Sequence, residues 1–280
     1  MATLKEALNQ ARVSLQTRNI EDASFESELL LRHTLKITRA QLYANPDRIL
    51  TREEETTFWV FVKRRLNLEP LAYIARSREF YGLSFYVDHR VLIPRPETEL
   101  LVEETIKSAQ NYPSLTIADI GTGAGAIAIS LALNLPQAKI YATDISKPAL
   151  EVARINAERH KVSHRIELLE GNLLEPLPGP FDLVVANLPY VTGQELAKTE
   201  ELGWEPQVAL YGGQDGLDKI RELLNQLEKK NAPKGSVFLE VGLGQAKTVT
   251  RLFKHYCPEA CIEALPDLGG ITRVITLIER

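Results

Sequence analysis

Phe181-Asp-Leu-Val-Val-Ala-Asn-Leu-Pro-Tyr190 joins an apolar run to a turn that ends it. The run is apolar on both faces, which predicts a strand buried on both sides within a parallel sheet. Pro189 cannot continue the hydrogen-bonded ladder, and it keeps Leu188 extended. Asn187 and Tyr190 therefore lie at the carboxyl end of a central strand, where open α/β sheets bind ligands.

The turn has the chemistry to hold a planar –NH2 group. The side-chain oxygen of Asn187 can accept one hydrogen bond, and the carbonyl of Leu188 offers a second acceptor whose direction Pro189 fixes. Tyr190 adds a flat face for a conjugated group. The stretch predicts a site for an amide or an exocyclic amine, and a plain strand-ending turn is the alternative, because Asn and Pro are ordinary turn residues.

Length and composition predict one large domain and a small one. The chain has 280 residues, 44% of them hydrophobic, and a net charge of −4 without the basic excess typical of nucleic-acid binding. No apolar run approaches a membrane span, and Glu6 lies where a signal peptide would be apolar, so we expect a cytoplasmic protein. Cys257, Cys261 and five scattered histidines predict free thiols and no metal site.

The first 75 or so residues are predicted to be helical. Apolar residues recur at helical spacing from Leu4 onward. Ser24 is the expected N-cap of a second helix, and Thr51 with Glu54 forms a capping box that opens another, ending near Leu66. We expect a module that docks a macromolecule or covers the site, although a purely structural cap would show the same pattern.

Charge is balanced in this region, because residues 1–80 hold thirteen Lys/Arg and eleven Asp/Glu. Lys63-Arg64-Arg65 is a basic cluster that a solvated helix end explains as well as a binding surface does. From Arg78 to Ile93 the period changes, which predicts a two-stranded hairpin that turns near Asp88-His89. The charged residues that follow suggest the edge of a site: Arg95, Glu97 and Glu99.

A glycine-rich turn, residues 121–125, lies between a predicted strand at 116–120 and a predicted helix at 126–133. The next strand, 139–143, ends in Asp144, nineteen residues beyond Gly125, where an acid accepts hydrogen bonds from ribose hydroxyls. No Lys-Ser/Thr follows the glycines, which excludes a P-loop, and Ala126 replaces the third glycine of a dinucleotide site. Further strands are expected at 166–170, 181–186, 236–241, 261–265 and 271–278, and helices at 217–229 and 245–256.

These residues carry a resemblance. Asp119–Ile127 resembles the first motif of class I S-adenosylmethionine-dependent methyltransferases, and Asn187–Tyr190 is similar to the Asn-Pro-Pro-Tyr motif of their amino-methylating members. Ile93–Glu99 and the helical front end narrow the resemblance to the release-factor glutamine N5-methyltransferase family, over essentially all 280 residues. Leu188 is a departure, because the family usually has proline there.

The resemblance implies an α/β fold: a seven-stranded Rossmann-like methyltransferase sheet with the last strand antiparallel, and a small N-terminal helical domain joined by a β-hairpin. The implied divisions are 1–77 for binding the substrate protein, 78–94 for the hairpin linker and 95–280 for the methyltransferase domain. The implied reaction uses S-adenosylmethionine, without a metal, to methylate N5 of the glutamine in the Gly-Gly-Gln motif of class I peptide chain release factors. We expect a monomer that binds neither nucleic acid nor membrane.

The resemblance also assigns residues to the site. The cofactor-binding residues would be Gly121, Thr122, Gly123, Ala124, Gly125, Asp144, Asn172 and Asn187. The catalytic residues would be Asn187, Leu188, Pro189 and Tyr190. Asn172 follows a predicted strand and would bond the adenine edge, although it is also an ordinary turn residue.

Two other functions fit part of the pattern. An adenine- or guanine-amino methyltransferase would use the same turn on an exocyclic amine, but it would normally need a basic surface. A non-catalytic cofactor-binding scaffold would not need Asn187 and Tyr190 together. Gly212-Gly213-Gln214 copies the implied target triplet, so self-methylation is conceivable, but a glycine turn before the next helix is the favoured interpretation.

Overall fold

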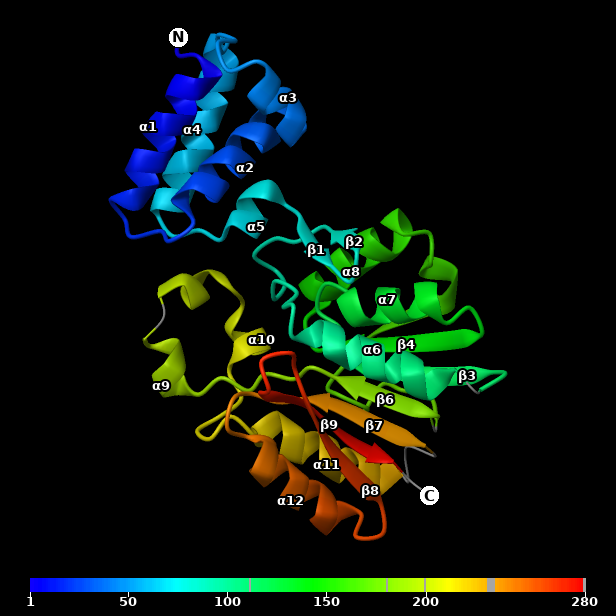
Figure 1. Ribbon diagram of the computed structural model, residues 1–280. Coiled ribbons are helices and arrows are strands. Elements are labelled where there is room, and N and C mark those ends of the chain that lie inside the picture. Colours follow the sequence, from blue (N-terminus) through cyan, green and yellow to red (C-terminus); the bar gives the residue numbers. More distant parts are fainter. Residues whose placement is uncertain (111, 180, 199, 231–234, 279–280) are drawn as a thin grey trace. The chain divides into compact units, whose positions relative to one another are not determined.

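The computed structural model describes residues 1–110, 112–179, 181–198, 200–230 and 235–278 (Figure 1). Contacts divide the chain into two compact units, residues 1–76 and 77–280. The predicted three-part division of the chain stays a prediction, but the segment 78–94 belongs to the second of these units.

The first unit is helical, as predicted. Its core is a cluster of buried leucines with Phe58 and Val62, and it includes the predicted Leu4, Ala11 and Leu15. Thr51 and Glu54 form the expected capping box. The helices are α1 (Leu4–Gln16), α2 (Ala23–Leu35), α3 (Arg39–Ala44), α4 (Arg52–Leu66) and α5 (Leu71–Ala75).

One expectation for this unit is wrong, and another holds only in part. The N-cap of α2 is Asp22, not Ser24, because the buried Ala23 already belongs to the helix and packs into the core. The basic cluster at the end of α4 is solvated only in part: Lys63 is exposed, whereas Arg65 is only 7% exposed and its Nε lies 2.5 Å from Oε2 of Glu26. The Arg65 side chain is therefore used inside the unit.

The second unit is built on a seven-stranded sheet in the order β5-β4-β3-β6-β7-β9-β8. All neighbours pair in parallel except β9, which is antiparallel to β7 and to β8. The predicted sheet with an antiparallel last strand is confirmed. Its strands are β3 (Leu115–Ile120), β4 (Ala138–Asp144), β5 (Ile166–Glu170), β6 (Leu183–Ala186), β7 (Ser236–Glu240), β8 (Cys261–Pro266) and β9 (Thr272–Ile278).

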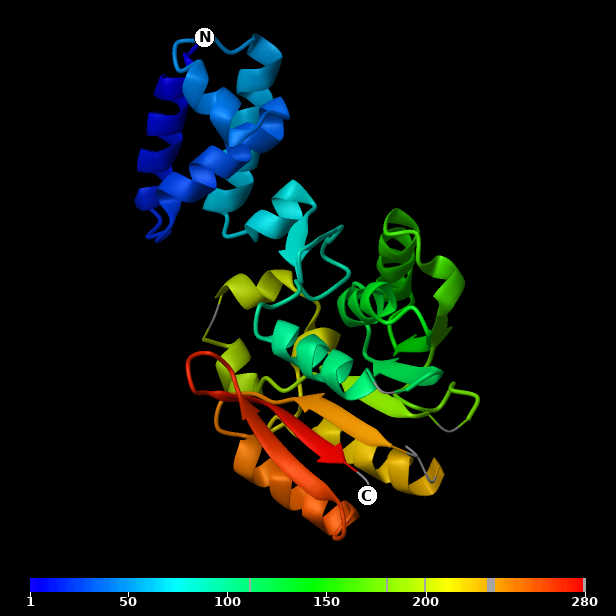
Figure 2. The same cartoon turned by 45° about the vertical axis from the view of Figure 1, so that its right-hand side comes forward.

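Helices cover both faces of this sheet, as Figures 1 and 2 show from two sides. One face carries α6 (Thr98–Ala109), α7 (Ala126–Asn134) and α8 (Lys147–Arg159), and the other carries α11 (Asp218–Lys230) and α12 (Ala246–Tyr256). Leu223 and Leu227 of α11 pack with Val184 in the buried core. Shorter helices lie in the connections: η1 (Ser163–Arg165), α9 (Gly193–Leu196), η2 (Glu200–Trp204) and α10 (Gln207–Leu210).

The predicted hairpin exists, but its turn is elsewhere. β1 (Arg78–Phe80) pairs with β2 (Leu83–Phe85), and the turn is Tyr81-Gly82 with φ of 50° and 70°, instead of Asp88-His89. Two central residues with positive φ match the right-handed twist of the strands. Tyrosine rarely takes this conformation, which is why the sequence pattern concealed the turn.

In the described parts of the chain, no helix is long and apolar enough to cross a membrane. Nor does any group of three or more His, Cys, Asp or Glu side chains in those parts come together as a metal ion would require. Cys257 and Cys261 are free thiols, at the end of α12 and the start of β8.

Candidate active site

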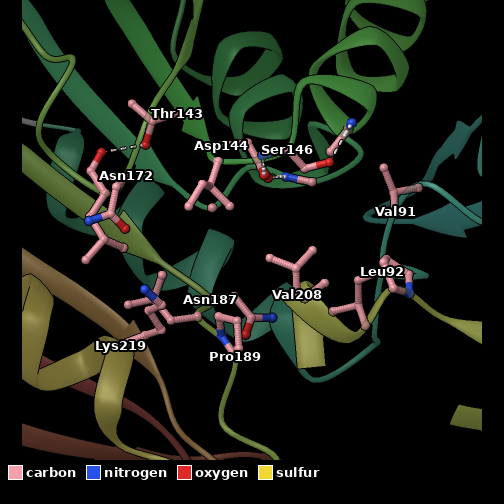
Figure 3. A pocket seen from close by; sticks show the side chains of 18 of the residues that line it. Val91, Leu92, Thr143, Asp144, Ser146, Asn172, Asn187, Pro189, Val208 and Lys219 are labelled. Carbon is pink, nitrogen blue, oxygen red and sulfur yellow. Dashed lines mark hydrogen bonds between the residues drawn. The ribbon is translucent and has the colours of Figure 1, made fainter. Parts of the chain in front are cut away.

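A cavity lies at the carboxyl ends of β3, β4, β5 and β6. β3 pairs with β4 on one side and with β6 on the other, so the connections diverge here, as at the ligand site of other open α/β sheets. About 900 Å³ is free of atoms, the open mouth included. Figure 3 shows Asp144 on one wall, Asn187 and Pro189 on the opposite wall, Asn172 near one end and Val91 near the other.

The glycine-rich turn brings the backbone to the cavity. Gly121 and Gly123 line it, and both have positive φ. A Cβ on Gly123 would meet no atom within 4 Å, so its open side leaves room for a ligand. Gly125 has another role, because a Cβ there would lie 3.3 Å from Cα of Ala153, and the turn could no longer approach α8 so closely.

Asp119 holds this turn against α7, although the sequence did not mark it as a site residue. Its fully buried Oδ2 accepts hydrogen bonds from Oγ1 of Thr122 at 2.7 Å and from N of Ala128 at 3.1 Å. Burial raises the pKa of Asp119 to about 7. Its Oδ1 has no hydrogen-bond partner within the described residues. The signal was present, because Asp119 is an acid near the end of a buried strand, as Asp144 is.

Asp144 presents a carboxylate to the cavity from the end of β4, as expected. Its Oδ2 accepts from N of Gly123 and its Oδ1 from N of Ser146, both at 2.8 Å. Burial raises the pKa of Asp144. Each oxygen keeps a further lone pair, so the held carboxylate can still accept hydrogen bonds from a diol.

Asn172, just beyond β5, presents its amide to the same cavity. Its Nδ2 donates to Oε1 of Glu222 at 2.6 Å, and Nζ of Lys219 binds Oε2 of Glu222 at 2.7 Å. Because the nitrogen is bonded to the protein, the amide oxygen is the atom available to a ligand.

Asn187 immediately follows β6, as predicted. Its Nδ2 donates to Oγ1 of Thr98 at 3.0 Å, and Thr98 is the buried first residue of α6. The side chain of Leu188 is 3% exposed and packs into the core, so the residue is anchored by burial even without a second proline.

A second cavity, with about 510 Å³ free of atoms, adjoins the first. Asn187 and Leu188 line both cavities, whereas Tyr190 lines the second and not the first. Burial raises the pKa of Tyr190 to about 12. The structure thus brings the residues of the motif to one shared wall, with Tyr190 on the far side from the glycine turn.

Glu205 joins two segments that line these cavities. Its Oε2 accepts from N of Ile93 at 2.9 Å and its Oε1 from Nη2 of Arg95 at 2.5 Å, and Glu205 is only 6% exposed. Leu92 lines both cavities from one segment, and Ala209 does so from the other. The suggestion that Arg95 marks a site edge fits this position, but the pairing across 110 residues had no sequence signal.

Gly212 of the Gly-Gly-Gln stretch packs against the motif. A Cβ there would lie 2.4 Å from O of Pro189 and 2.7 Å from Cα of Tyr190, and N of Gly212 donates to O of Val191 at 2.9 Å. The stretch therefore has a structural reason to contain glycine, which supports the interpretation as a turn. Self-methylation of Gln214 stays untested.

Comparison with known proteins decides the family. A family model described as the PrmC N-terminal domain matches residues 6–75, and one described as the methyltransferase small domain matches residues 96–205. The chain is 40% identical over 278 residues to the release factor glutamine methyltransferase of Geobacter sulfurreducens, covering 98% of this chain and 95% of that protein. The chain belongs to the release factor glutamine methyltransferase family. The resemblance inferred from its motifs is thereby confirmed.

Other matches agree with this membership. The release factor glutamine methyltransferase of Moorella thermoacetica is 39% identical over 280 residues, covering 99% of both chains. A crystal structure of ribosomal protein L11 methylase from Lactobacillus delbrueckii subsp. bulgaricus has a TM-score of 0.50 and 25% identity, covering 69% of this chain and 83% of that one. A 16S rRNA N2 G1207 methyltransferase from T. thermophilus, in complex with AdoMet and guanosine, has a TM-score of 0.51 and 17% identity. The match covers 73% of this chain and 50% of that one. The chain has the fold of a methyltransferase.

Proposed function

We propose that this methyltransferase transfers the methyl group of S-adenosylmethionine to N5 of the glutamine in the Gly-Gly-Gln motif of class I peptide chain release factors. The observation that carries the proposal is that Asn187 and Leu188 line both cavities. They would offer a pair of acceptors, Oδ1 of Asn187 and the carbonyl of Leu188, to a group bound there. The first cavity would hold the cofactor and the second the glutamine side chain.

The first cavity fits the cofactor by its donors and acceptors. Asp144 would accept hydrogen bonds from the ribose hydroxyls, and the oxygen of Asn172 would accept one from the adenine amino group. The free Oδ1 of the buried Asp119 lies beneath the glycine turn and suits a nearby positive charge. When bound, S-adenosylmethionine supplies an electrophilic methyl group on a sulfonium, which takes the bonding electron pair as the methyl leaves.

The acceptor pair would act on an amide that is a poor nucleophile. Resonance places the nitrogen lone pair in the C–N bond, whose rotation barrier in a peptide is about 18–20 kcal/mol. When Oδ1 of Asn187 and the carbonyl oxygen of Leu188 accept hydrogen bonds from the two N–H groups of the glutamine amide, electron density shifts toward the amide nitrogen. The two bonds also fix the plane of the amide and the direction of its lone pair, and positioning of this kind can lower a barrier by about 7–11 kcal/mol.

The nitrogen must also lose a proton. Arg95 and Tyr190 are the ionisable side chains among the described residues that line the second cavity. Arg95 is paired with Glu205, and burial raises the pKa of Tyr190 to about 12, so neither serves as a base near neutral pH. We infer that the proton leaves late, once the forming N–C bond has made the nitrogen acidic, and passes through Oδ1 of Asn187 or directly to water.

The helical unit would contact the body of the release factor. Its family model matches separately from that of the methyltransferase domain, and some of its basic side chains are paired within the unit, as in Arg65–Glu26 and Arg64–Glu69. Because thirteen Lys/Arg are nearly balanced by eleven Asp/Glu in residues 1–80, its surface suits a protein partner better than a nucleic acid. The monomeric state and the cytoplasmic location stay predictions.

The test is a transfer assay with labelled S-adenosylmethionine. The protein is incubated separately with a release factor, with its Gln→Ala variant in the Gly-Gly-Gln motif, and with total RNA. We expect label only in the unmodified release factor, and peptide mass spectrometry should place one methyl group on that glutamine. Label in the RNA, or equal label in the Gln→Ala variant, would contradict the proposal.

A further inference from the structure

We propose that Glu240, acting through Thr98, determines which way the Asn187 amide faces, and so makes the site accept an –NH2 group and reject a carboxylate. The inference rests on the proposed function and adds two positioning residues to it. Neither residue lines the cofactor cavity or the glutamine cavity.

The fold brings three distant parts of the chain together behind the shared wall. Ala186 of β6 pairs with Leu239 of β7, so Asn187, just beyond β6, lies beside Glu240, the last residue of β7. Thr98, at the start of α6, is hydrogen-bonded to Asn187 and lies near the carboxyl of Glu240. Glu240 is 1% exposed and Thr98 is 4% exposed, so water does not compete for these groups.

The hydrogen bonds have one consistent direction. Nδ2 of Asn187 donates to Oγ1 of Thr98 at 3.0 Å, so this oxygen acts as an acceptor. A hydroxyl has one hydrogen to donate, and the buried carboxyl of Glu240 lies near enough to the Thr98 hydroxyl to influence it electrostatically, so we take it as the acceptor of that hydrogen. Glu240 therefore receives that hydrogen, Thr98 receives one from Asn187, and Oδ1 of Asn187 is left for the substrate.

The carboxyl of Glu240 also accepts a hydrogen bond from Tyr190, the second polar residue of the motif. Oη of Tyr190 donates to Oε1 of Glu240 at 3.4 Å. Two hydroxyls thus point at one buried acceptor, and they flank the wall where the glutamine amide would bind. The arrangement explains why both Asn187 and Tyr190 are oriented without a direct contact between them.

Packing alone does not account for Glu240. Residues 237–239 of β7 are Val, Phe and Leu, all buried. Glu240 follows them, and its Oε2 has no hydrogen-bond partner within the described residues, an arrangement that costs stability. An apolar residue would fill the position without that cost, so the acceptor is retained for the bonds that it receives.

Reversal of the Asn187 amide would change the specificity of the site. Nδ2 would then face the glutamine cavity, where it would repel an incoming –NH2 group and attract an oxygen. A flipped site would therefore bind glutamate in place of glutamine more readily. Thr98 and Glu240 prevent this, because the flipped Oδ1 would need the hydrogen that Thr98 already gives to Glu240.

The experiment compares Thr98→Val, which removes the hydroxyl but keeps the branched shape, with Thr98→Ser, which keeps the hydroxyl. Thr105→Val is the matched control, since Thr105 lies two turns further along α6, is fully buried and donates from its hydroxyl to O of Leu101 in the same helix. Each protein is assayed for kcat and KM with a release factor, for cofactor affinity, and for inhibition by the release factor whose target glutamine is changed to glutamate.

We expect Thr98→Val to lower kcat by about 10²-fold, as the loss of one preorganised hydrogen bond does elsewhere, with cofactor affinity within about twofold. The preference for binding the glutamine protein over its glutamate variant should narrow by about tenfold, a change of 1.4 kcal/mol. Thr98→Ser should recover most of that preference, and Thr105→Val should keep all of it.

Two results would overturn the inference. One is a Thr98→Val protein that loses activity while its preference for glutamine over glutamate is unchanged. The other is an equal loss in Thr98→Ser and Thr98→Val. If Thr98→Val does not fold, Glu240→Met, which removes the acceptor at similar length, replaces it: the preference should still narrow, and an unchanged preference overturns the inference. Failure of the wild-type protein to methylate the release factor would instead refute the proposed function.

Discussion

Asn187 and Asn172 both line the first cavity, but their amide nitrogens are held by different acceptors. Each donates through Nδ2 to an oxygen of the protein, Thr98 Oγ1 at 3.0 Å and Glu222 Oε1 at 2.6 Å, and so turns its own oxygen toward a ligand. Figure 3 shows the two side chains at separate places around the cavity. Thr98 is a buried hydroxyl, whereas the side chain of Glu222 is 37% exposed and paired with Lys219.

This difference indicates which asparagine is better placed to act in methyl transfer and which in cofactor binding. A buried hydroxyl held by a buried carboxyl keeps one geometry, and a hydrogen bond there is not weakened by water. An exposed carboxylate with a lysine partner is screened and mobile, so it contributes modestly. Changes around Asn187 should therefore alter kcat, and changes around Asn172 should alter cofactor affinity.

The comparison is tested most strongly by Asn187→Ala. This variant should lower kcat by about 10²–10³-fold, because it removes one of two acceptors that orient the amide. Its cofactor affinity, measured by calorimetry, should stay within a few-fold of wild type. A fully active variant would end the assignment of Asn187 to the reaction.

Asp144→Ala should act on binding instead. Hydrogen bonds to a charged group contribute about 1.5–3 kcal/mol, so cofactor affinity should fall by about ten- to a hundredfold. At saturating cofactor, kcat should return close to the wild-type value. Calorimetry and kinetics together check this split, and unchanged cofactor affinity would show that Asp144 does not contact the ligand.

Gly212→Ala should disturb the Asn187 side of the site alone. The added Cβ would lie 2.4 Å from O of Pro189, so the loop must shift, and the free energy of unfolding should fall by about 1–3 kcal/mol. Gly179→Ala is the control, since a Cβ there meets no atom within 4 Å. Equal stability of the two variants in urea denaturation would contradict the described packing.

Glu222→Gln should have a smaller effect, limited to the Asn172 side. It replaces the charged acceptor of Asn172 by a neutral amide, and the net loss of about 0.5–1.5 kcal/mol corresponds to a two- to tenfold weaker affinity for the cofactor. Calorimetry with the cofactor measures it. A loss of cofactor affinity as large as that of Asp144→Ala would contradict this, because it would show that the exposed carboxylate of Glu222 contributes more than a solvent-screened group should.

The pH dependence of stability isolates Glu240. Burial raises its pKa from 4.5 to about 7, so between these values the unfolded chain releases a proton that the folded chain keeps. Folding stability supplied by this group is thus lost as pH rises. The Tm of Glu240→Gln relative to wild type should increase from pH 4.5 to 7, while Asp119 responds alike in both proteins. A constant difference in Tm would contradict the raised pKa.

Local patterns predicted what depends on neighbours in the chain. The apolar strands, the glycine turn, Asp144 at a strand end and Asn187 two residues before Pro189 were all visible because their structural causes lie within a few residues. The turn at Tyr81-Gly82 was missed because an unusual residue adopts positive φ, and the N-cap of α2 was misplaced because tertiary burial of Ala23 decided it.

Long-range partners could not be predicted. Thr98 and Asn187 are 89 residues apart, and Ile93 and Glu205 are 112 apart, so only the folded sheet shows that they meet. Glu240 did carry a signal, an acid that ends an apolar strand as Asp144 does. Its meaning depends on β7 lying beside β6, which the sequence order of the strands does not reveal.

The most direct test is a structure of the protein bound to the demethylated cofactor product and a release factor. The account predicts that the glutamine nitrogen lies about 2.7–3.2 Å from both Oδ1 of Asn187 and the carbonyl of Leu188, and faces the sulfur of the product. A glutamine held through its oxygen, or a nitrogen out of reach of both acceptors, would contradict it.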